Sequence, residues 1–385
     1  MNRSNVARQT VLLLTVSPWD EPKRLRRQLA EVLSQDSDIV YVTLPFGLRK
    51  PACNTDRMDG SIRVISLAGP PVPLRLFLRF PALRLAYERI LAWQLGRRLV
   101  DTANISAVFC FTSNYPTLLA RFQHVPVIYV ANDDHASMAG SLFARKIILR
   151  DQARAIALCD RVVSVSEVIA RKLSQHGKPV HVMYPGHNCE VLPLDHFSNS
   201  ERLERSVCFF GYIDWRIDFD LLTFLLNNGW YVALIGPVIG TAHLIAGLQE
   251  RFPERFDVLP AVAAEQAVDL LARYEVLIVP YHYRTAEQAA VMELPNKMFV
   301  YFSALRPVVT TWMPNLKLVE SGLIYRAATH DEFLSLCLRA IEEDSAAYAA
   351  RRRRVSQENT WETRRSTLRA LIEGADSPLL PEVVS

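Results

Sequence analysis

The chain contains 385 residues, of which 50% are hydrophobic and 22% are charged. A chain of this length is expected to form two domains, and its composition supplies enough apolar surface for full cores, which excludes an intrinsically disordered protein. Its six cysteines form no Cys-x-x-Cys pair and have no histidines at metal-ligand spacing, so the sequence predicts neither a zinc site nor a disulfide framework.

The charge is distributed unevenly along the chain. Residues 1–190 carry 25 Lys and Arg against 15 Asp and Glu, whereas the remaining residues carry 19 against 25, within a net charge of +4. A basic N-terminal half favours anionic lipid, nucleic acid or phosphorylated substrates as partners, and a solvated surface is the alternative.

The first apolar run, residues 11–16, is too short for the hydrophobic region of a signal peptide, and no small-residue cleavage site follows it. No stretch reaches the roughly 18 uninterrupted apolar residues that a membrane-spanning helix needs. We therefore expect a cytoplasmic protein whose membrane contact, if any, is peripheral and at the inner face of the membrane.

Short β-branched runs alternate with helical stretches throughout the chain, a pattern typical of parallel sheets covered by helices. In the first half the predicted strands are residues 11–15, 39–43, 62–66, 107–111, 127–130, 161–165 and 180–183. In the second half they are residues 207–210, 231–235, 256–259, 276–279 and 307–310. Two such series predict an α/β protein with two doubly wound domains.

The polar segment 191–205, which contains Pro193, separates the two series and is the predicted linker. The N-terminal domain then spans residues 1–190 and the C-terminal domain residues 206–345. Residues 346–385 have helical composition and no predicted strand. We expect terminal helices there, which can pack back on the N-terminal domain.

Residues 74–100 mix six arginines with Phe, Leu, Trp and Tyr. Such a segment can lie in a membrane interface with its apolar face inserted and its arginines at the headgroups. A buried amphipathic helix of the fold is the alternative reading, and the sequence leaves both open.

Ligands of open α/β sheets bind beyond the carboxyl ends of the strands, so the residues after each predicted strand are the candidates for a site. Gly211 follows a strand and precedes a helix, where a backbone can approach a phosphate; a tight turn is the alternative. Asn296 opens a later helix and Lys297 lies in its first turn, where a cation opposes the helix dipole unless an anion binds. Lys297 is therefore a candidate diphosphate contact, with a surface charge as the alternative, and Arg216 is a second candidate.

Several segments resemble, in the same order, the motifs of glycosyltransferase family 4. The run PNKMFVYFSALRPVVTTWMPNL resembles the segment P-x-K-hydrophobic-x-E-Y-x-A-x-G-x-P-V-V, CFFGYIDWRIDFDLL resembles G-x-I-x-x-x-x-D-x-x-L-L, and YVALIGPV resembles a strand ending in I-G-P. VLPAVAAEQAVDLLARYEVLIVPY matches the lobe around the nucleobase, and CDRVVSVSEVIARKLSQHG with MYPGHN matches the exit of the first domain. This resemblance covers nearly the whole chain and implies the GT-B fold, two Rossmann-like domains facing across a cleft.

The same resemblance implies a nucleoside diphosphate sugar as donor, UDP- or GDP-linked, bound by the C-terminal domain. No acidic D-x-D motif occurs at a donor-side strand end, so we expect Lys297, a helix dipole and Arg216 to neutralise the diphosphate without a metal. The donor-binding residues implied are Gly211, Arg216, Gly236, Val262, Tyr281, Glu293, Asn296, Lys297 and Tyr301. Two positions depart from the pattern: Val300 replaces the glutamate that hydrogen-bonds the donor ribose, and Leu305 replaces a glycine. A valine cannot accept that hydrogen bond, and Glu293 is the nearest carboxylate that could replace it.

Asp133, Asp134 and His135 follow the predicted strand at 127–130. Two carboxylates and an imidazole at a strand end suit removal of a proton from an acceptor hydroxyl, and capping of the next helix is the alternative. A looser resemblance extends to the inverting glucuronosyltransferases of xanthan-type polysaccharide assembly, whose catalytic base matches Asp133. We therefore place Asp133 ahead of Asp134 as the base.

The loop after the first strand, SPWDEPKRLRRQLA, supplies a second set of acceptor-side candidates. Trp19 could stack on a sugar, and Arg26 or Arg27 could pair with a phosphate, although arginines on a helix surface are the usual case.

Together these features predict a glycosyltransferase that moves a hexosyl or glucuronosyl group to a hydroxyl of a lipid-linked or polysaccharide acceptor, in surface or exopolysaccharide synthesis of the bacterial type. Nucleic acid is not an expected partner. Two alternatives remain: a catalytically silent GT-B protein that binds nucleotide or a partner, suggested by Val300 and Leu305, and a sugar-nucleotide 2-epimerase, for which no dedicated acid and base are found. The family 4 likeness suggests retention at the anomeric carbon, whereas Asp133 as base suggests inversion.

Overall fold

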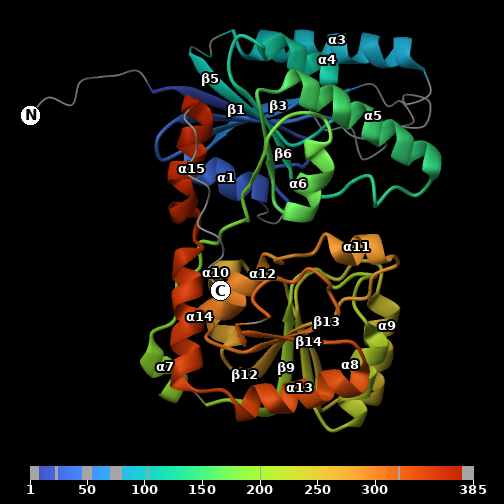
Figure 1. Cartoon of the computed structure of the whole chain (residues 1–385), viewed down its shortest axis with the longest axis vertical. Coiled ribbons are helices and arrows are strands. Elements are labelled where there is room, and N and C mark those ends of the chain that lie inside the picture. The colour runs from blue at the N-terminus through green and yellow to red at the C-terminus, as the bar shows by residue number, and fades with distance from the viewer. Residues whose placement is uncertain are drawn as a thin grey trace, which may run out of the picture. The chain divides into compact units, whose positions relative to one another are not determined.

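The computed structural model describes residues 8–21, 25–45, 54–69, 80–100, 102, 104–199, 201–319 and 321–374. They form two compact units, each with its own sheet (Figure 1). The first unit comprises the chain up to Tyr184 together with the residues from Arg364, and the second begins at Pro185 and ends at Thr363. Each unit is built of α-helices around a largely parallel sheet, which confirms the predicted α/β class with two doubly wound units.

The described sheet of the first unit has the strand order β3-β4-β2-β1-β5-β6-β7-β8. The strands are β1 (Thr10–Thr15), β2 (Asp38–Thr43), β3 (Thr55–Asp59), β4 (Ile62–Ser66), β5 (Ile105–Cys110), β6 (Val127–Ala131), β7 (Arg161–Ser164) and β8 (Val180–Val182). All neighbours pair in parallel except β3 and β4. Every residue of β1 is buried, as expected for a central parallel strand with helices on both faces.

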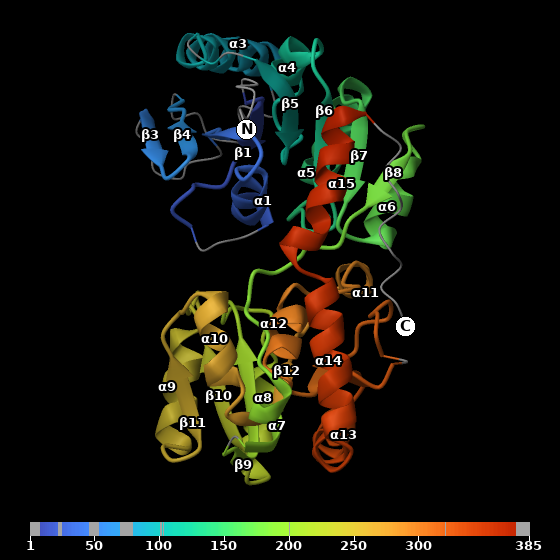
Figure 2. The same ribbon diagram turned by 90° about the vertical axis from the view of Figure 1, so that its left-hand side faces the viewer.

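Helices cover this sheet. They are α1 (Leu25–Leu33), α3 (Pro81–Arg98), α4 (Pro116–Leu119), α5 (Leu142–Leu158), α6 (Glu167–Ser174) and α15 (Trp361–Glu373). Figure 2 shows α15 along the sheet beside β7, where the Arg161 guanidinium donates to the carbonyl of Leu371 at 3.0 Å. Asp36 holds the same helix, because its carboxylate pairs with Arg365 at 2.6 Å and with Arg369.

The second unit has the strand order β11-β10-β9-β12-β13-β14, all parallel. Its strands are β9 (Leu203–Phe210), β10 (Tyr231–Ile235), β11 (Phe256–Leu259), β12 (Tyr274–Val279), β13 (Val308–Thr311) and β14 (Ile324–Ala327). Its helices are α7 (Leu194–Asn199), α8 (Phe219–Asn227), α9 (Ala242–Arg251), α10 (Ala264–Leu271), α11 (Ala286–Ala290), α12 (Lys297–Ser303), α13 (His330–Glu342) and α14 (Ala346–Glu358). Helices α8 and α13 contact each other on the sheet, while α10 contacts α12, which in turn packs on α14.

The chain changes units at places other than the predicted linker. Residues 191–205 lie inside the second unit: the Leu192 amide donates to the carbonyl of Ser303 at 3.0 Å, and α7 packs on α14. Pro193 directly precedes α7, a position that proline tolerates because the first helical residues need no intrahelical N–H bond. Of the expected terminal helices, α14 belongs to the second unit and the residues of α15 from Arg364 belong to the first.

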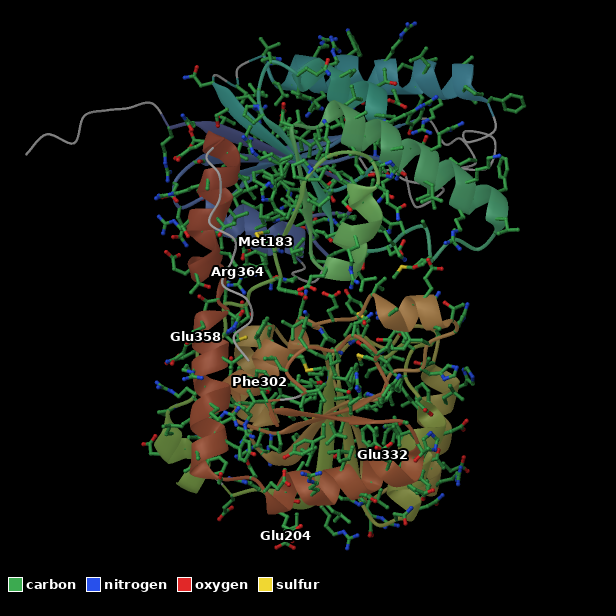
Figure 3. All side chains as sticks on the ribbon, in the orientation of Figure 1. Met183, Glu204, Phe302, Glu332, Glu358 and Arg364 are labelled. Carbon is green, nitrogen blue, oxygen red and sulfur yellow. The ribbon has the colours of Figure 1, made fainter. Side chains whose placement is uncertain are left out.

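The chain crosses between the two units twice, and a hydrogen bond joins the two crossing segments within each unit. In the first unit, the Arg364 guanidinium donates to the carbonyl of Tyr184 at 3.2 Å, and Figure 3 shows Arg364 close to Met183. In the second unit, the amide of Trp361 donates to the carbonyl of His187 at 3.0 Å.

Part of the 74–100 segment, residues 74–79, lies outside the described residues. The rest forms α3, whose side chains alternate between buried and exposed positions. Among the described helices, none combines the length and the apolar character needed to cross a membrane.

Candidate functional site

The strand order of the second unit reverses between β9 and β12, the place where open α/β sheets bind ligands. The loops after these two strands meet at the carboxyl edge of the sheet, where the amide of Asp218 donates to the carbonyl of Pro280 at 2.8 Å. Gly211 follows β9 and Gly236 follows β10. Both have positive φ, 142° and 147°, and a Cβ on Gly236 would lie 2.0 Å from the carbonyl oxygen of Gly211. Glycine is therefore required at position 236, because the two loops touch backbone to backbone.

Lys297, the first residue of α12, reaches this edge of the sheet. Its ammonium group donates to the hydroxyl of Tyr281 at 2.7 Å and lies 3.8 Å from the centre of the Phe209 ring. A Cβ on Gly211 would come within 2.7 Å of the same nitrogen, so the glycine leaves room for the lysine. Burial, together with the nearby Arg216 cation, holds the pKa of Lys297 well below its ordinary 10.5.

Arg216 is the second cation of this cluster. Its guanidinium pairs with the Asp214 carboxylate at 2.7 Å and lies 5.2 Å from the centre of the Tyr281 ring. Lys297 lies 4.7 Å from the centre of that ring, so both cations lie close to Tyr281. An anion beside Tyr281 would relieve the mutual repulsion of the two cations and favour the charged form of Lys297.

A pocket of about 270 Å³, which Tyr281 helps to line, opens within the second unit. It is lined by the loops after β12, β13 and β14 and by the first turns of α8 and α13, with Asp218, Tyr281, Tyr283, Thr311, Trp312 and His330 among the lining residues. Asp218 caps α8 by accepting from the amide of Leu221 at 2.9 Å, and its second oxygen lies 3.1 Å from Nε2 of His330. Aromatic rings with a few polar groups are the usual lining of a site for a small organic ligand.

Most of these lining residues escaped the sequence reasoning. Asp218, Trp312 and His330 come from three separate loops. Trp312 and His330 lie near Tyr281 because β13 and β14 end at the same edge of the sheet as β12. Trp312 is 50% exposed and carries the Arg326 guanidinium at 4.0 Å over its ring. The strand-end rule that selected Gly211 applies equally to Trp312, which follows the predicted strand 307–310, and it would have selected the loop that contains His330 had β14 been recognised as a strand.

The remaining donor-side candidates do not all reach the cluster. Tyr301 is fully buried; its hydroxyl accepts from the amide of Phe210 at 2.9 Å and donates to the carbonyl of Ile278 at 3.1 Å. Tyr301 therefore supports the ends of β9 and β12 and has no surface for a ligand. Glu293 is also buried, Asn296 is exposed beside Lys297, and Val262 is half-buried in the loop after β11.

The two departures from the family 4 pattern lie on or next to the same helix. Val300 is buried in α12 and offers no hydrogen-bond acceptor from its side chain. Leu305 has a φ of 59°, in the left-handed region that a leucine side chain disfavours by about 1–2 kcal/mol. A glycine would adopt this backbone without strain, which accounts physically for the glycine of the pattern.

In the first unit, Asp133 and Asp134 follow β6 and have different surroundings. Asp134 is buried; its carboxylate accepts from the amide of Ser137 at 3.1 Å and pairs with the Lys172 ammonium at 2.6 Å. Asp133 is half-buried and accepts a hydrogen bond from the side-chain amide of Asn132. His135, also half-buried, lies in the turn that Asp134 caps. Asp134 thus has a structural role, and Asp133 is the more accessible carboxylate.

Arg26 contacts Asn132, the residue that precedes Asp133. It is buried, donates to the hydroxyl of Ser17 at 2.8 Å and to the side-chain oxygen of Asn132 at 3.2 Å, and lies 6.0 Å from the centre of the Phe111 ring. Arg26 therefore connects the carboxyl ends of β1 and β6 through Asn132, the neighbour of Asp133.

Trp19 and Arg27 face inward. Trp19 is buried, donates to the carboxylate of Asp59 at 2.5 Å and lies edge-on to Tyr41 with ring centres 4.9 Å apart. Arg27 covers the Trp19 ring at 4.5 Å and pairs with Glu31 at 3.2 Å. In this conformation the indole ring has no free face for a sugar. The sequence analysis did not predict β3, the strand that contains Asp59, and therefore did not predict the burial of Trp19.

Within the part of the chain that the structure describes, no group of three or more His, Cys, Asp or Glu side chains is placed to hold a metal ion.

No protein-family model matches the sequence. A Bacillus subtilis protein provisionally described as the teichuronic acid biosynthesis glycosyltransferase TuaH is 23% identical over 272 residues, which cover 64% of this chain and 66%, just under two thirds, of that protein. The solved structure of sucrose-phosphate synthase from Thermosynechococcus elongatus superposes with a TM-score of 0.72 at 14% identity, over 95% of this chain and 99% of the synthase. Anabaena HepE in complex with UDP and glucose superposes with a TM-score of 0.67 at 14% identity, over 95% of this chain and 99% of HepE.

Proposed function

The chain has the GT-B fold, and we propose from it that the protein is a glycosyltransferase that uses a UDP-linked sugar as donor. The observation that carries the proposal is the pair of cations, Lys297 and Arg216, both close to the ring of Tyr281 at the switch point of the second sheet. Asp214 already pairs with Arg216, and a diphosphate would supply negative charge for Lys297 as well. HepE, whose structure is similar, has been solved with UDP and glucose.

We assign the pocket that Tyr281 helps to line to one ring of the same donor, because Tyr281 belongs both to the pocket and to the cationic cluster. Gly211 leaves room for the Lys297 ammonium group and Gly236 for the loop after β9, so both glycines shape the proposed diphosphate site. Lys297 and Arg216 stabilise the charge that develops on the UDP leaving group as the glycosidic bond breaks. The donor then needs no metal to neutralise its phosphates, a proposal that donor binding in EDTA tests directly.

The acceptor is proposed to bind the first unit, with Asp133 as general base. Its carboxylate takes the proton of the acceptor hydroxyl while the hydroxyl oxygen forms a bond to the anomeric carbon and UDP departs with the bonding electrons. This step inverts the anomeric configuration. We propose a lipid-linked or polysaccharide acceptor and peripheral membrane contact on the cytoplasmic side, supported by the basic N-terminal half of the sequence and by the teichuronic acid assignment of the relative.

Val300 favours one second candidate, a GT-B protein that binds nucleotide without catalysing transfer. Its side chain cannot supply the ribose hydrogen bond that the family pattern places there. Such a protein would bind UDP and leave every donor sugar intact.

The test is calorimetry and release of the nucleoside diphosphate with a panel of UDP-linked glucose, galactose, glucuronic acid and N-acetylglucosamine, and with GDP-mannose, in buffer containing EDTA. We expect one UDP-sugar to bind with clear preference and to release UDP, faster with acceptor present. Binding of UDP without release from any donor supports the silent alternative. No binding of any nucleotide by the wild type refutes the donor site itself.

A further inference from the structure

The second unit has another cavity, away from the cluster of Lys297 and Arg216, with a volume of about 370 Å³. Its described lining residues are Glu201, Arg202, Leu203, Tyr231, Asp257, Leu259, Arg273 and Tyr274. Leu203, Tyr231 and Tyr274 are the first residues of β9, β10 and β12, so the cavity lies at the amino edge of the parallel sheet. Ligands of such sheets normally bind at the carboxyl edge, where the donor is proposed to bind. The donor therefore does not account for this amino-edge cavity.

Two tyrosine side chains line the amino-edge cavity. The rings of Tyr231 and Tyr274 stack with their centres 6.4 Å apart and their planes 27° apart. Tyr274 is buried, whereas Tyr231 is half-buried, so part of the Tyr231 side chain is accessible from the cavity. The Tyr231 hydroxyl donates to the Asp257 carboxylate. Burial raises the pKa of Tyr231 to about 12, so this hydroxyl keeps its proton at neutral pH and the ring stays fixed beside the carboxylate.

The charged groups of the amino-edge cavity balance one another. Glu201 and Asp257 are exposed carboxylates, and Arg202 and Arg273 supply an equal number of cations. Arg202 already has a partner, because it pairs with the buried carboxylate of Asp344 at 3.2 Å. Within the part of the chain that the structure describes, no ion pair involves Arg273, Glu201 or Asp257. Three exposed polar side chains are thus left with capacity for hydrogen bonds to a ligand.

This combination favours a neutral ligand that is rich in hydroxyl groups. A phosphate or a nucleotide would be repelled by the carboxylates of Glu201 and Asp257, and an apolar ligand would leave their hydrogen bonds unmade. The hydroxyls of a sugar donate to carboxylates and accept from a guanidinium, and the C–H groups of its ring pack on an aromatic face. A pyranose ring can therefore use every kind of group that lines the cavity.

We propose that the amino-edge cavity binds one neutral sugar residue, which packs on the ring of Tyr231. Asp257 and Glu201 accept hydrogen bonds from its hydroxyls, and Arg273 donates to them. The sugar residue belongs to the glycan on which the enzyme acts, and only this identification rests on the proposed function. An enzyme that holds the same glycan at a second site raises the local concentration of the chain end between transfers.

The experiment is saturation-transfer difference NMR on the full-length protein, with maltose, cellobiose and lactose as probes and an excess of UDP to fill the proposed donor site. We expect saturation to reach the ring protons of at least one of these sugars. Asp257→Ala and Arg273→Ala should each weaken sugar binding about tenfold, and Tyr231→Ala should abolish it. Because Asp257 and Arg273 are exposed, their variants keep the test valid even if Tyr231→Ala does not fold.

The matched control is Glu250→Ala on α9, which removes an exposed carboxylate that does not line the cavity and should leave sugar binding unchanged. No sugar signal from the wild type, or a signal that Asp257→Ala and Arg273→Ala leave unchanged, refutes the site. Binding of inorganic phosphate that Arg273→Ala abolishes also refutes it, because the cavity then takes an anion.

Two comparisons test the link to the enzyme. A longer oligomer of the sugar that binds should bind more tightly than the disaccharide, since it offers more rings to the same cavity. Equal affinity would overturn the assignment to a glycan and indicate a free sugar. The cavity variants should bind UDP as the wild type does. A wild type that binds these sugars but no UDP would refute the proposed function and leave the sugar site intact.

Discussion

A Cβ atom on Gly236 would lie 2.0 Å from the carbonyl oxygen of Gly211, at the carboxyl ends of two neighbouring strands. Gly236→Ala should therefore push the two loops apart, in addition to straining a backbone with a φ of 147°, at a cost of about 1–3 kcal/mol of unfolding free energy. The affinity for UDP, measured by calorimetry, should fall together with the stability.

The control for this change is Gly247→Ala, on α9. A Cβ at Gly247 meets nothing within 4 Å, and alanine is the better helix former by about 1 kcal/mol. The melting temperature should rise slightly and UDP affinity should not change. Equal behaviour of the two variants would show that the contact between the loops does not constrain position 236.

Lys297 should make donor binding depend on pH between its lowered pKa and 10.5. Its pKa lies well below 10.5 in the free protein, and a bound diphosphate raises it. UDP affinity should fall as the pH rises from the lowered pKa towards 10.5, because the ammonium form that binds UDP is then depleted. Lys297→Arg keeps its charge and should lose this dependence, whereas Lys297→Ala should weaken binding about ten- to a hundredfold.

The same lowered pKa sets the sign of a stability effect. Between the lowered pKa and 10.5 the unfolded chain binds a proton at this lysine that the folded chain does not, so the unfolding free energy should rise with pH there. Lys297→Met should show no such rise in urea titrations over that range. A parallel pH profile for both proteins would contradict the buried state of the ammonium group.

Asp133→Asn should abolish sugar transfer and leave UDP binding unchanged, since asparagine keeps the shape but cannot take the proton. The expected loss of kcat is about 10²–10⁴-fold. Asp134→Asn should chiefly lower the melting temperature, because it removes the ion pair with Lys172.

A double-mutant cycle of Asp134 with Lys172 tests the structural role of Asp134. Lys172→Met should lower stability as Asp134→Asn does, and the double variant should lose little more. Transfer by Asp133→Asn at the wild-type rate would rule out Asp133 as the base. Anomeric analysis of the product then decides whether the reaction proceeds with retention.

Asp36 should contribute to stability above its ordinary pKa and lose that contribution in acid. Hydrogen bonds from Arg365, and then from Arg369, hold its pKa well below the ordinary 3.8. Asp36→Asn should cost about 0.5–1 kcal/mol near neutral pH, and the difference from the wild type should shrink as the pH falls below 3.8 and the wild-type carboxyl is protonated. Thermal melting of both proteins against pH measures this. Asp38→Asn, whose side chain is exposed beside Arg8 at 3.9 Å, is the control and should change little.

The strands that the sequence reveals are those with buried faces. β1, β2 and β10 are continuous apolar runs, since helices cover both sides of a parallel sheet. β3 escapes because its residues are mostly exposed, so its only signal is its pairing with β4. β14 escapes because it is short and half-buried at the edge of its sheet.

The residues of the candidate site divide in the same way, into those that have a local signal in the sequence and those that do not. Gly211 and Lys297 could be predicted because strand ends and helix starts are local features of sequence. Tyr301 shares their motif, but whether a motif residue faces a ligand or the core depends on helix orientation, which long-range packing decides. The assembly of Asp218, Trp312 and His330 around one pocket depends on sheet topology and has no local signal.

The return of α15 to the first unit has a consequence for synthesis of the protein on the ribosome. The second unit is complete in sequence at Thr363, whereas the first still lacks the helix that Asp36 and Arg161 hold. At about 5–20 residues per second, synthesis of the second unit keeps the first unit without this helix for on the order of ten seconds or more. During this time the groove for α15 is open to chaperones and proteases. A premature stop near position 360 would leave it open permanently, so loss of the last few per cent of the chain should damage the domain that was translated first.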